Sequence, residues 1–483
     1  MNINPSRFTN WSRTATARRF LTMLLVVLAV LALPDFVSAQ TSAKSNGNKS
    51  NGKEKGKKAD SAPSNGPRDY RSSNFLVHSD LPADEANELL KRLEAMLVLI
   101  SKYWGKPNKQ TIEMFVVRDL EVWPPNSLER PGRDSIEQRA GITITSGSVN
   151  RQTGKLLAAK SRVYAIADRG VPQHEAVHAY CHQNFGRAGP TWYSEGMAEM
   201  GHCWREGESR VHCLPHIVKY LRSVEPKSLR AIVNGREQTG DSWQNYAWRW
   251  ALCHLLANNP NYYDRFRPLG LGILADQPDA TFERVYGSMS QEIAFEYLFF
   301  LQHFDLGYEV TLTAWDWKTK FRSVTATLPV TCVVEAKHGW QASRLQVKAG
   351  DEIEVTAEGT WSLSADGPEF TPFGAELPAP KPDPEKPGKS SKSATPKRAS
   401  KNGTEGLEEL PSVMRYESRF KPGQLVGVLF NDYELSEPFP IPADEVLVAP
   451  SEGQLFLRCE EAWNRLADNQ GKVNVKFKVK SDK

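Results

Sequence analysis

The pattern of hydrophobic and polar residues divides the chain into two parts. Residues 82–104 repeat apolar side chains every three to four positions, so that Leu89, Leu93 and Leu97 fall on one face of an amphipathic helix. Short apolar runs around this helix predict strands at 74–78, 111–117 and 141–147. Farther along, three runs suit packed helices, at 217–223, 246–259 and 290–304.

From Thr325 onward the hydrophobic pattern repeats every two residues. Apolar and polar residues alternate in five stretches, at 330–336, 351–359, 424–430, 453–459 and 472–480. This alternation is typical of half-buried antiparallel strands. It predicts a β-sandwich of jelly-roll kind over residues 325–483, interrupted at 377–409 by a Pro/Lys/Ser-rich insert that we expect to be a flexible surface loop.

The first 39 residues have the features of a secretory signal. Arginines precede an apolar run of 14 residues, Phe20–Leu33, and Val37–Ala39 offers small residues for cleavage. The alternative is an uncleaved membrane anchor, for which this run is short. We therefore expect an exported protein, periplasmic or extracellular, without a stable membrane span after cleavage. Residues 40–70 are rich in Lys, Ser, Asn and Gly and predict a disordered linker.

The charge balance argues against a nucleic-acid partner. The whole chain has a formal charge of +4, and residues 1–39 hold four arginines and one aspartate, a net +3, which leaves +1 for the remainder. A near-neutral chain gives no general basis for binding nucleic acid.

Six cysteines allow disulfides in an exported protein, but their spacing does not fix a pairing. They are Cys181, Cys203, Cys213, Cys253, Cys332 and Cys459.

The stretch VPQHEAVHAYCH, residues 171–182, carries the most specific chemistry. On a helix, His174 and His178 lie one turn apart on the same face, with Glu175 beside them. Two imidazoles in this arrangement can hold zinc, and the carboxylate can take a proton from a metal-activated water. His182 continues the same stripe by one more turn and is a rival ligand, and a core helix that carries histidines is the alternative interpretation.

A third ligand is expected in the next segment, TWYSEGMAEM, residues 191–200. Glu195 follows His178 by 17 residues, which allows the first helix to end and a second helix to return a carboxylate to the histidines. Three protein ligands leave one zinc position open, as catalysis requires. Glu199 is one turn beyond Glu195, either as a rival ligand, as a group that orients a histidine, or as a surface charge. Another cluster, Cys203, Cys213, His212 and His216, is better explained as scattered core residues, because Pro215 breaks the helix register.

The pair HEAVH and WYSEGMAE resembles the gluzincin metallopeptidases, in particular the peptidase MA-like group. The resemblance implies an α+β metallopeptidase domain at residues 71–320, with a small mixed-sheet sublobe, a helical sublobe and the cleft between them. It also implies that 141–147 lines the cleft and pairs with the substrate backbone, although an ordinary strand has the same pattern. The Gly-x-Met-Glu-Asn stretch of related aminopeptidases is missing, which favours an endopeptidase.

Tyr246 begins a helical stretch downstream, where the aminopeptidase N-like enzymes have a tyrosine that hydrogen-bonds the oxyanion. The resemblance implies this role for Tyr246, and a core aromatic is the alternative.

The C-terminal part is similar to bacterial galactose-binding lectin-like sandwiches, in which a polar loop before the last strand holds calcium and sugar. That loop contains Asn464, Asp468 and Asn469 here, so calcium and a glycan partner are possible ligands, and ordinary turn chemistry is the other interpretation.

The sequence therefore predicts a secreted zinc-dependent peptidase acting on a protein or peptide. His174, His178 and Glu195 would bind Zn²⁺, Glu175 would be the general base, and Tyr246 would stabilise the oxyanion. The rival hypothesis is an envelope glycan-binding protein in which the peptidase-like domain is an inactive scaffold. Glu175 favours the enzyme, because a scaffold has no need of a carboxylate beside two aligned histidines.

Overall fold

The computed structural model describes residues 66–149, 156–207, 209–234, 243–378, 412–442 and 445–480. The predicted signal, most of the predicted linker and residues 379–409 of the predicted insert lie outside these ranges. Within them, no helix has both the length and the apolar character needed to cross a membrane.

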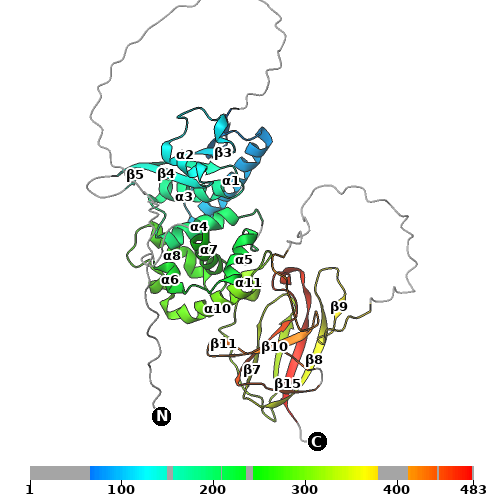
Figure 1. Cartoon of the computed structure of the whole chain (residues 1–483). Helices are drawn as coiled ribbons and strands as arrows, with labels where there is room; N and C mark the ends of the chain where they lie inside the picture. The colour runs from blue at the N-terminus through cyan, green and yellow to red at the C-terminus, as the bar shows by residue number, and fades with distance from the viewer. Residues whose placement is uncertain are drawn as a thin grey trace, which may run out of the picture. The chain divides into compact units, whose positions relative to one another are not determined.

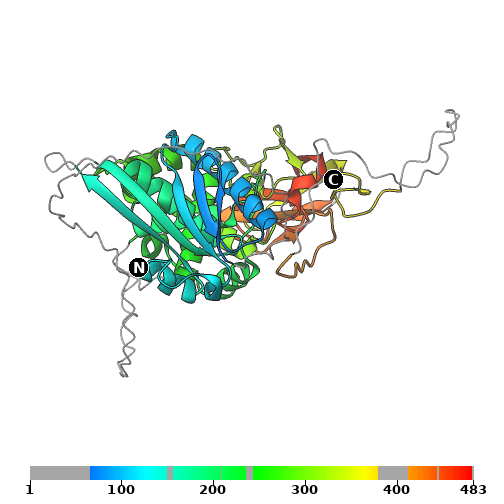
Figure 2. The same ribbon diagram turned by 90° about the horizontal axis from the view of Figure 1, so that it is seen from above.

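In the described part of the N-terminal half, five strands form a mixed sheet with the order β1-β2-β3-β5-β4. β2 and β3 are parallel, as are β3 and β5, whereas β1 and β4 pair antiparallel at the two edges. Figure 2 shows the two long strands of this sheet running side by side, in the cyan part of the colour range. The strands are Arg68–Arg71 (β1), Phe75–Ser79 (β2), Ile112–Val117 (β3), Gly141–Val149 (β4) and Leu156–Ile166 (β5).

Helices cover both faces of this sheet. α1 (Ala83–Trp104) and α3 (Val171–Phe185) share one apolar cluster with the inward residues of β2, β3 and β5. α2 (Arg130–Glu137) packs on the opposite face, where Ile136 and Tyr164 belong to a smaller cluster. α3 is therefore a buried helix, which places the motif histidines inside the molecule.

The second half of the domain is helical. In Figure 1 these helices lie beyond α3, on the side away from the sheet. They are α4 (Thr191–Cys203), α5 (Pro215–Ser223), α6 (Leu229–Val233), α7 (Trp243–Asn258), α8 (Tyr263–Leu274), α9 (Phe282–Tyr286), α10 (Ser290–His303) and α11 (Val310–Thr313). Short 3₁₀ turns occur at Leu120–Val122, Gly287–Met289 and Leu466–Asp468.

The described residues of the C-terminal part form two antiparallel sheets. One has the order β11-β10-β14-β7 with β12 on β10, and the other has β13-β8-β15-β6 with β9 on β8. Their facing sides enclose a separate apolar core. The strands are Val330–Glu335 (β6), Gln341–Val347 (β7), Glu352–Ser362 (β8), Glu369–Phe370 (β9), Leu425–Asn431 (β10), Glu434–Leu435 (β11), Phe439–Pro440 (β12), Val446–Val448 (β13), Gly453–Cys459 (β14) and Gln470–Val479 (β15).

The structure confirms the predicted mixed α/β first part and the antiparallel sandwich, and it adds elements that the pattern did not indicate. β1, β5 and α2 were not predicted, and β1 begins at Arg68, inside the segment expected to be linker. β1 is polar, and Tyr70 is its one residue that packs on the core. The strand is therefore recognised by its backbone pairing with β2 and not by a hydrophobic pattern in its own sequence. Such backbone pairing is a tertiary property that a polar four-residue stretch does not reveal.

The outer face of one sandwich sheet packs against the helical half. Val426, Val428 and Phe456 belong to the same apolar cluster as α7 and α10. Trp315 connects the two sides, since its ring lies 4.9 Å from that of Phe295 and 4.0 Å from that of Phe456. β10 and β14 are therefore buried on both faces, and their apolar residues lie on both faces instead of alternating with polar ones as predicted.

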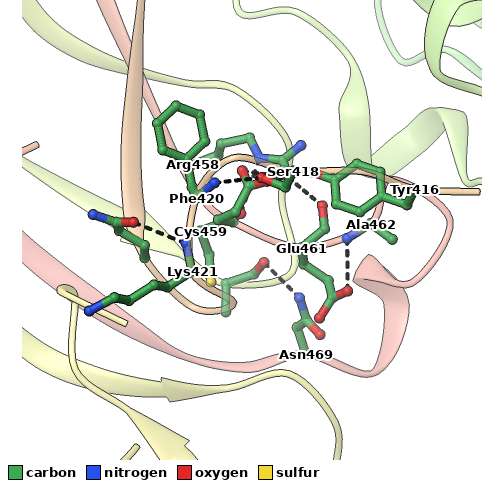
Figure 3. Close-up of polar contacts among 12 residues, drawn as sticks. Tyr416, Ser418, Phe420, Lys421, Arg458, Cys459, Glu461, Ala462 and Asn469 are labelled. Atoms are coloured by element: carbon green, nitrogen blue, oxygen red, sulfur yellow. Dashed lines mark hydrogen bonds and ion pairs between the residues drawn. The ribbon is translucent and has the colours of Figure 1, made fainter. Parts of the chain in front are cut away.

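A buried polar network lies at the end of β14 (Figure 3). The Arg458 guanidinium stacks 3.8 Å from the Trp463 ring centre and pairs with Glu460 at 3.3 Å. Glu460 also accepts hydrogen bonds from Tyr416, at 2.6 Å, and from Ser418. These partners satisfy a buried carboxylate and fix the segment that follows the insert against the sandwich.

We expect Trp315→Ala to destabilise the protein by about 3–5 kcal/mol, because the indole is buried against both sides of this contact. Urea unfolding followed by far-ultraviolet circular dichroism measures the change. Trp243→Ala is the matched control, since the Trp243 side chain is 44% exposed. Equal shifts in the two variants would show that the contact at Trp315 contributes little.

Candidate metal centre

Local sequence fixes where α3 begins and ends. Asp168 accepts hydrogen bonds from the backbone amides of Gly170 and Val171, at 2.9 and 2.7 Å, which gives partners to two amides at the start of the helix. Pro172 lies in the first turn, where its missing N–H costs nothing. The helix ends at Gly186, whose φ of 80° is the left-handed conformation that glycine adopts readily. The motif histidines thus stand in the middle of a well-defined helix.

Three ligand atoms converge between α3 and α4. The Nε2 atoms of His174 and His178 are 3.1 Å apart, and Glu195 Oε2 lies 3.4 and 3.3 Å from them. Two ligand atoms about 2.1 Å from zinc and at a tetrahedral angle are about 3.4 Å from each other. The three atoms therefore form a triangle of the size that one zinc ion requires, and these residues fit the metal.

The second imidazole nitrogen of each histidine also has a partner. His174 Nδ1 lies 3.0 Å from Glu199 Oε1, and His178 Nδ1 lies 3.4 Å from the Ser194 hydroxyl. Such contacts fix the ring orientation and leave Nε2 directed at the metal position. The structure thus places Glu195 at the ligand triangle and Glu199 behind His174, as a group that orients it.

His202 extends this arrangement and was not predicted. Its Nδ1 lies 3.8 Å from Glu199 Oε2, so Glu199 stands between two histidines. A Cβ atom at Gly170 would lie 2.2 Å from the His202 ring, so glycine there gives the ring its space. The signal was present in the sequence, because His202 follows Glu199 by three residues on the same helical face. His174, Glu199 and His202 also form a second group with ligand spacing.

The pKa values of the buried His174 and Glu195 depend on each other. Burial by itself raises the pKa of Glu195, but the positive charge and hydrogen bonds of His178 and His174 outweigh it and lower that pKa. Burial lowers the pKa of His174, and hydrogen bonds to Glu195 and Glu199 outweigh this effect and raise it well above the usual value. The carboxylates therefore retain their charge in the buried site, which suits the binding of a cation.

Glu175 lies beside the ligand triangle and is itself buried, with an exposed fraction of 6%. Its carboxylate oxygen Oε2 accepts a hydrogen bond from the Thr143 hydroxyl on β4, at 2.7 Å. The same hydroxyl lies 3.0 Å from the Glu175 backbone oxygen. The contact with β4 was not predicted, because only the tertiary fold brings residues 32 positions apart together.

Tyr246 reaches the site from α7. Its ring centre is 5.9 Å from that of His174, and the guanidinium carbon of Arg249 lies 5.5 Å from the Tyr246 ring centre. α7 comes close to the site because α4 carries Gly196, where a Cβ atom would lie 2.4 Å from Cys253 Sγ. The glycine of the EGMAE stretch is thus required by close helix packing, and the packing places Tyr246 near the candidate ligands.

The other sequence candidates do not join the site. His182 belongs to neither group with metal-ligand spacing, and burial followed by the charge of His178 lowers its pKa to about 4. Among the described residues, no such group contains Cys203, Cys213 or His216. All six cysteines are free thiols, and only Cys332 is partly exposed.

The loop considered for calcium has structural hydrogen bonds. The Asn464 side-chain amide donates to the backbone oxygen of Leu306, at 2.8 Å, whereas that of Asn469 donates to Ala336, at 3.2 Å. Asp468 is exposed. Figure 3 shows Asn469 in the same region as Glu461 and Ala462. These contacts agree with the interpretation of the loop as turn and packing chemistry.

Comparison with known proteins gives little further guidance. No family model and no curated protein matches the chain. Among solved structures, the chain is similar to one described as "EclA N-terminal domain; PllA-like lectin". That match has 15% sequence identity and covers 31% of this chain and 96% of the other. Its TM-score of 0.19 is too low to carry an argument about fold or ligand.

Proposed function

We propose that this protein is an exported zinc-dependent peptidase, with endopeptidase action on a protein or peptide. The observation that carries the proposal is the triangle of His174, His178 and Glu195 atoms, with sides of 3.1 to 3.4 Å. Two imidazole nitrogens that face each other at this distance repel unless a proton or a cation lies between them. A zinc ion satisfies all three groups at once and leaves a position for water.

The bound metal would make water acidic enough to attack a peptide carbonyl near neutral pH. Glu175 follows the first ligand directly along α3 and is buried, as the ligand histidines are. Its carboxylate would take the proton that the attacking water loses and deliver it to the nitrogen of the leaving amine. Glu175 would then be ionised again at the end of the cycle, so that no other group is needed to restore it.

Two further features would act on the substrate. Tyr246 stands next to His174, where its hydroxyl would donate a hydrogen bond to the oxyanion. β4 forms one edge of the described sheet, so its outward backbone groups can pair with an extended peptide. Backbone pairing of this kind selects extended chains with little regard to side chains, which suits an endopeptidase.

The test is a peptide-library digest with purified protein whose zinc content has been measured. We expect about one zinc per chain, hydrolysis at internal bonds, loss of hydrolysis on chelation, and recovery when zinc is restored. A full complement of zinc with no hydrolysis of any peptide would refute the proposal and would support the glycan-binding hypothesis. Hydrolysis that survives complete removal of the metal would also refute it.

A further inference from the structure

We propose that Thr143 is a positioning residue, whose hydroxyl holds the Glu175 carboxylate in place. This inference rests on the proposed peptidase function and adds to it a residue that no sequence motif marks. It is carried by the two contacts of the Thr143 hydroxyl, 2.7 Å to Glu175 Oε2 and 3.0 Å to the Glu175 backbone oxygen.

The surroundings leave the Glu175 side chain little freedom. Gly141 is two residues before Thr143 on β4, so both residues face α3. A Cβ atom at Gly141 would lie 2.7 Å from Glu175 Cγ and 2.7 Å from Val171 Cγ1. The side chain therefore occupies a slot that only glycine leaves open, and Thr143 supplies the hydrogen bond within that slot.

The Thr143 hydroxyl lies within hydrogen-bond distance of both the carboxylate oxygen Oε2 and the backbone oxygen of Glu175. It therefore contacts the side chain and the main chain of the same residue, which fixes the carboxyl group relative to the helix that carries it. A valine at this position would have the same shape and would provide neither bond.

The position of Thr143 on β4 also links the base to the substrate. β4 pairs with β5 on one side, and its other side is the edge of the described sheet. A peptide bound along this edge would meet the backbone of the strand whose side chain holds Glu175. The strand would thus set the distance between the base and the peptide bond under attack, a positional effect of the kind that raises kcat.

The experiment compares Thr143→Val with Thr143→Ser in the full-length protein. We expect Thr143→Val to lower kcat about tenfold, with KM changed less than about twofold and with zinc content and unfolding temperature unchanged. Thr143→Ser keeps the hydroxyl and should retain most of kcat. Thr313→Val is the matched control, because Thr313 is a buried threonine on α11 whose hydroxyl donates to the backbone oxygens of Glu309 and Val310, each at 3.3 Å.

A double-mutant cycle separates positioning from a general structural effect. If Thr143 acts through Glu175, Thr143→Val should cause no further loss when Glu175 is already replaced by Gln. Additive losses, a loss of zinc in Thr143→Val, or an equal loss in Thr143→Ser would overturn the inference. So would wild-type kcat in Thr143→Val, provided that the wild-type protein hydrolyses peptides and Glu175→Gln does not. If the wild-type protein itself does not hydrolyse peptides, the proposed function fails instead.

Discussion

Glu175→Gln is expected to abolish most peptide hydrolysis while the protein keeps its zinc. The amide has nearly the shape of the carboxylate but cannot accept the proton of the attacking water, and general-base catalysis contributes on the order of 10²–10⁴-fold. Glu175 supplies none of the three ligand atoms, so the variant should keep its zinc. Steady-state kinetics on a short peptide, together with elemental analysis of the same sample, measures both quantities.

The matched control is Glu137→Gln on α2, where the Glu137 side chain is 52% exposed and pairs with Arg133 at 3.0 Å. That pair lies on the opposite face of the sheet from α3. The control should retain wild-type kcat and zinc. If Glu175→Gln turned over at the wild-type rate at saturating substrate, another group would have to be the base, and the assignment of Glu175 would be wrong.

His178→Ala is expected to remove most of the zinc. The variant leaves one imidazole and one carboxylate, and two protein ligands hold zinc far more weakly than the usual three of a catalytic site. It also removes the group that faces both His174 Nε2 and Glu195 Oε2. Elemental analysis after dialysis against a weak chelator gives the zinc content per chain.

His182→Ala is the control for His178→Ala. Both histidines are on α3 and one turn apart, but His182 belongs to neither group with ligand spacing. Its replacement should leave the zinc content unchanged. Equal zinc in His178→Ala and wild type would contradict the ligand set, and loss of zinc in His182→Ala would point to His182 as a ligand.

Much of the site could be predicted because its residues are close along one helix. The spacing of His174 and His178 depends on the helical repeat alone, and the break near Gly186 ends the helix by local backbone geometry. Glu195 and Glu199 occupy a second helix, so their common face was predictable as well. The strands with clear alternation in the sandwich were likewise predicted from local pattern.

Contacts between distant segments were not predictable in the same way. Which of Glu195 and Glu199 faces the Nε2 atoms depends on how α4 packs against α3 and α7, which approaches α4 closely at Gly196. The Thr143 contact depends on the register of β4 beside α3, which one residue of shift would reverse.

The sequence by itself determined the elements whose periodicity is local: α1, α3, the alternating strands of the sandwich, and the residue types able to hold zinc. The tertiary structure alone decided that β1 pairs with β2, that Glu199 stands between His174 and His202, and that Thr143 meets Glu175. The physical reason is that backbone geometry acts over a few residues, whereas side-chain packing joins segments through space, and the chain order does not encode that packing as a repeating pattern.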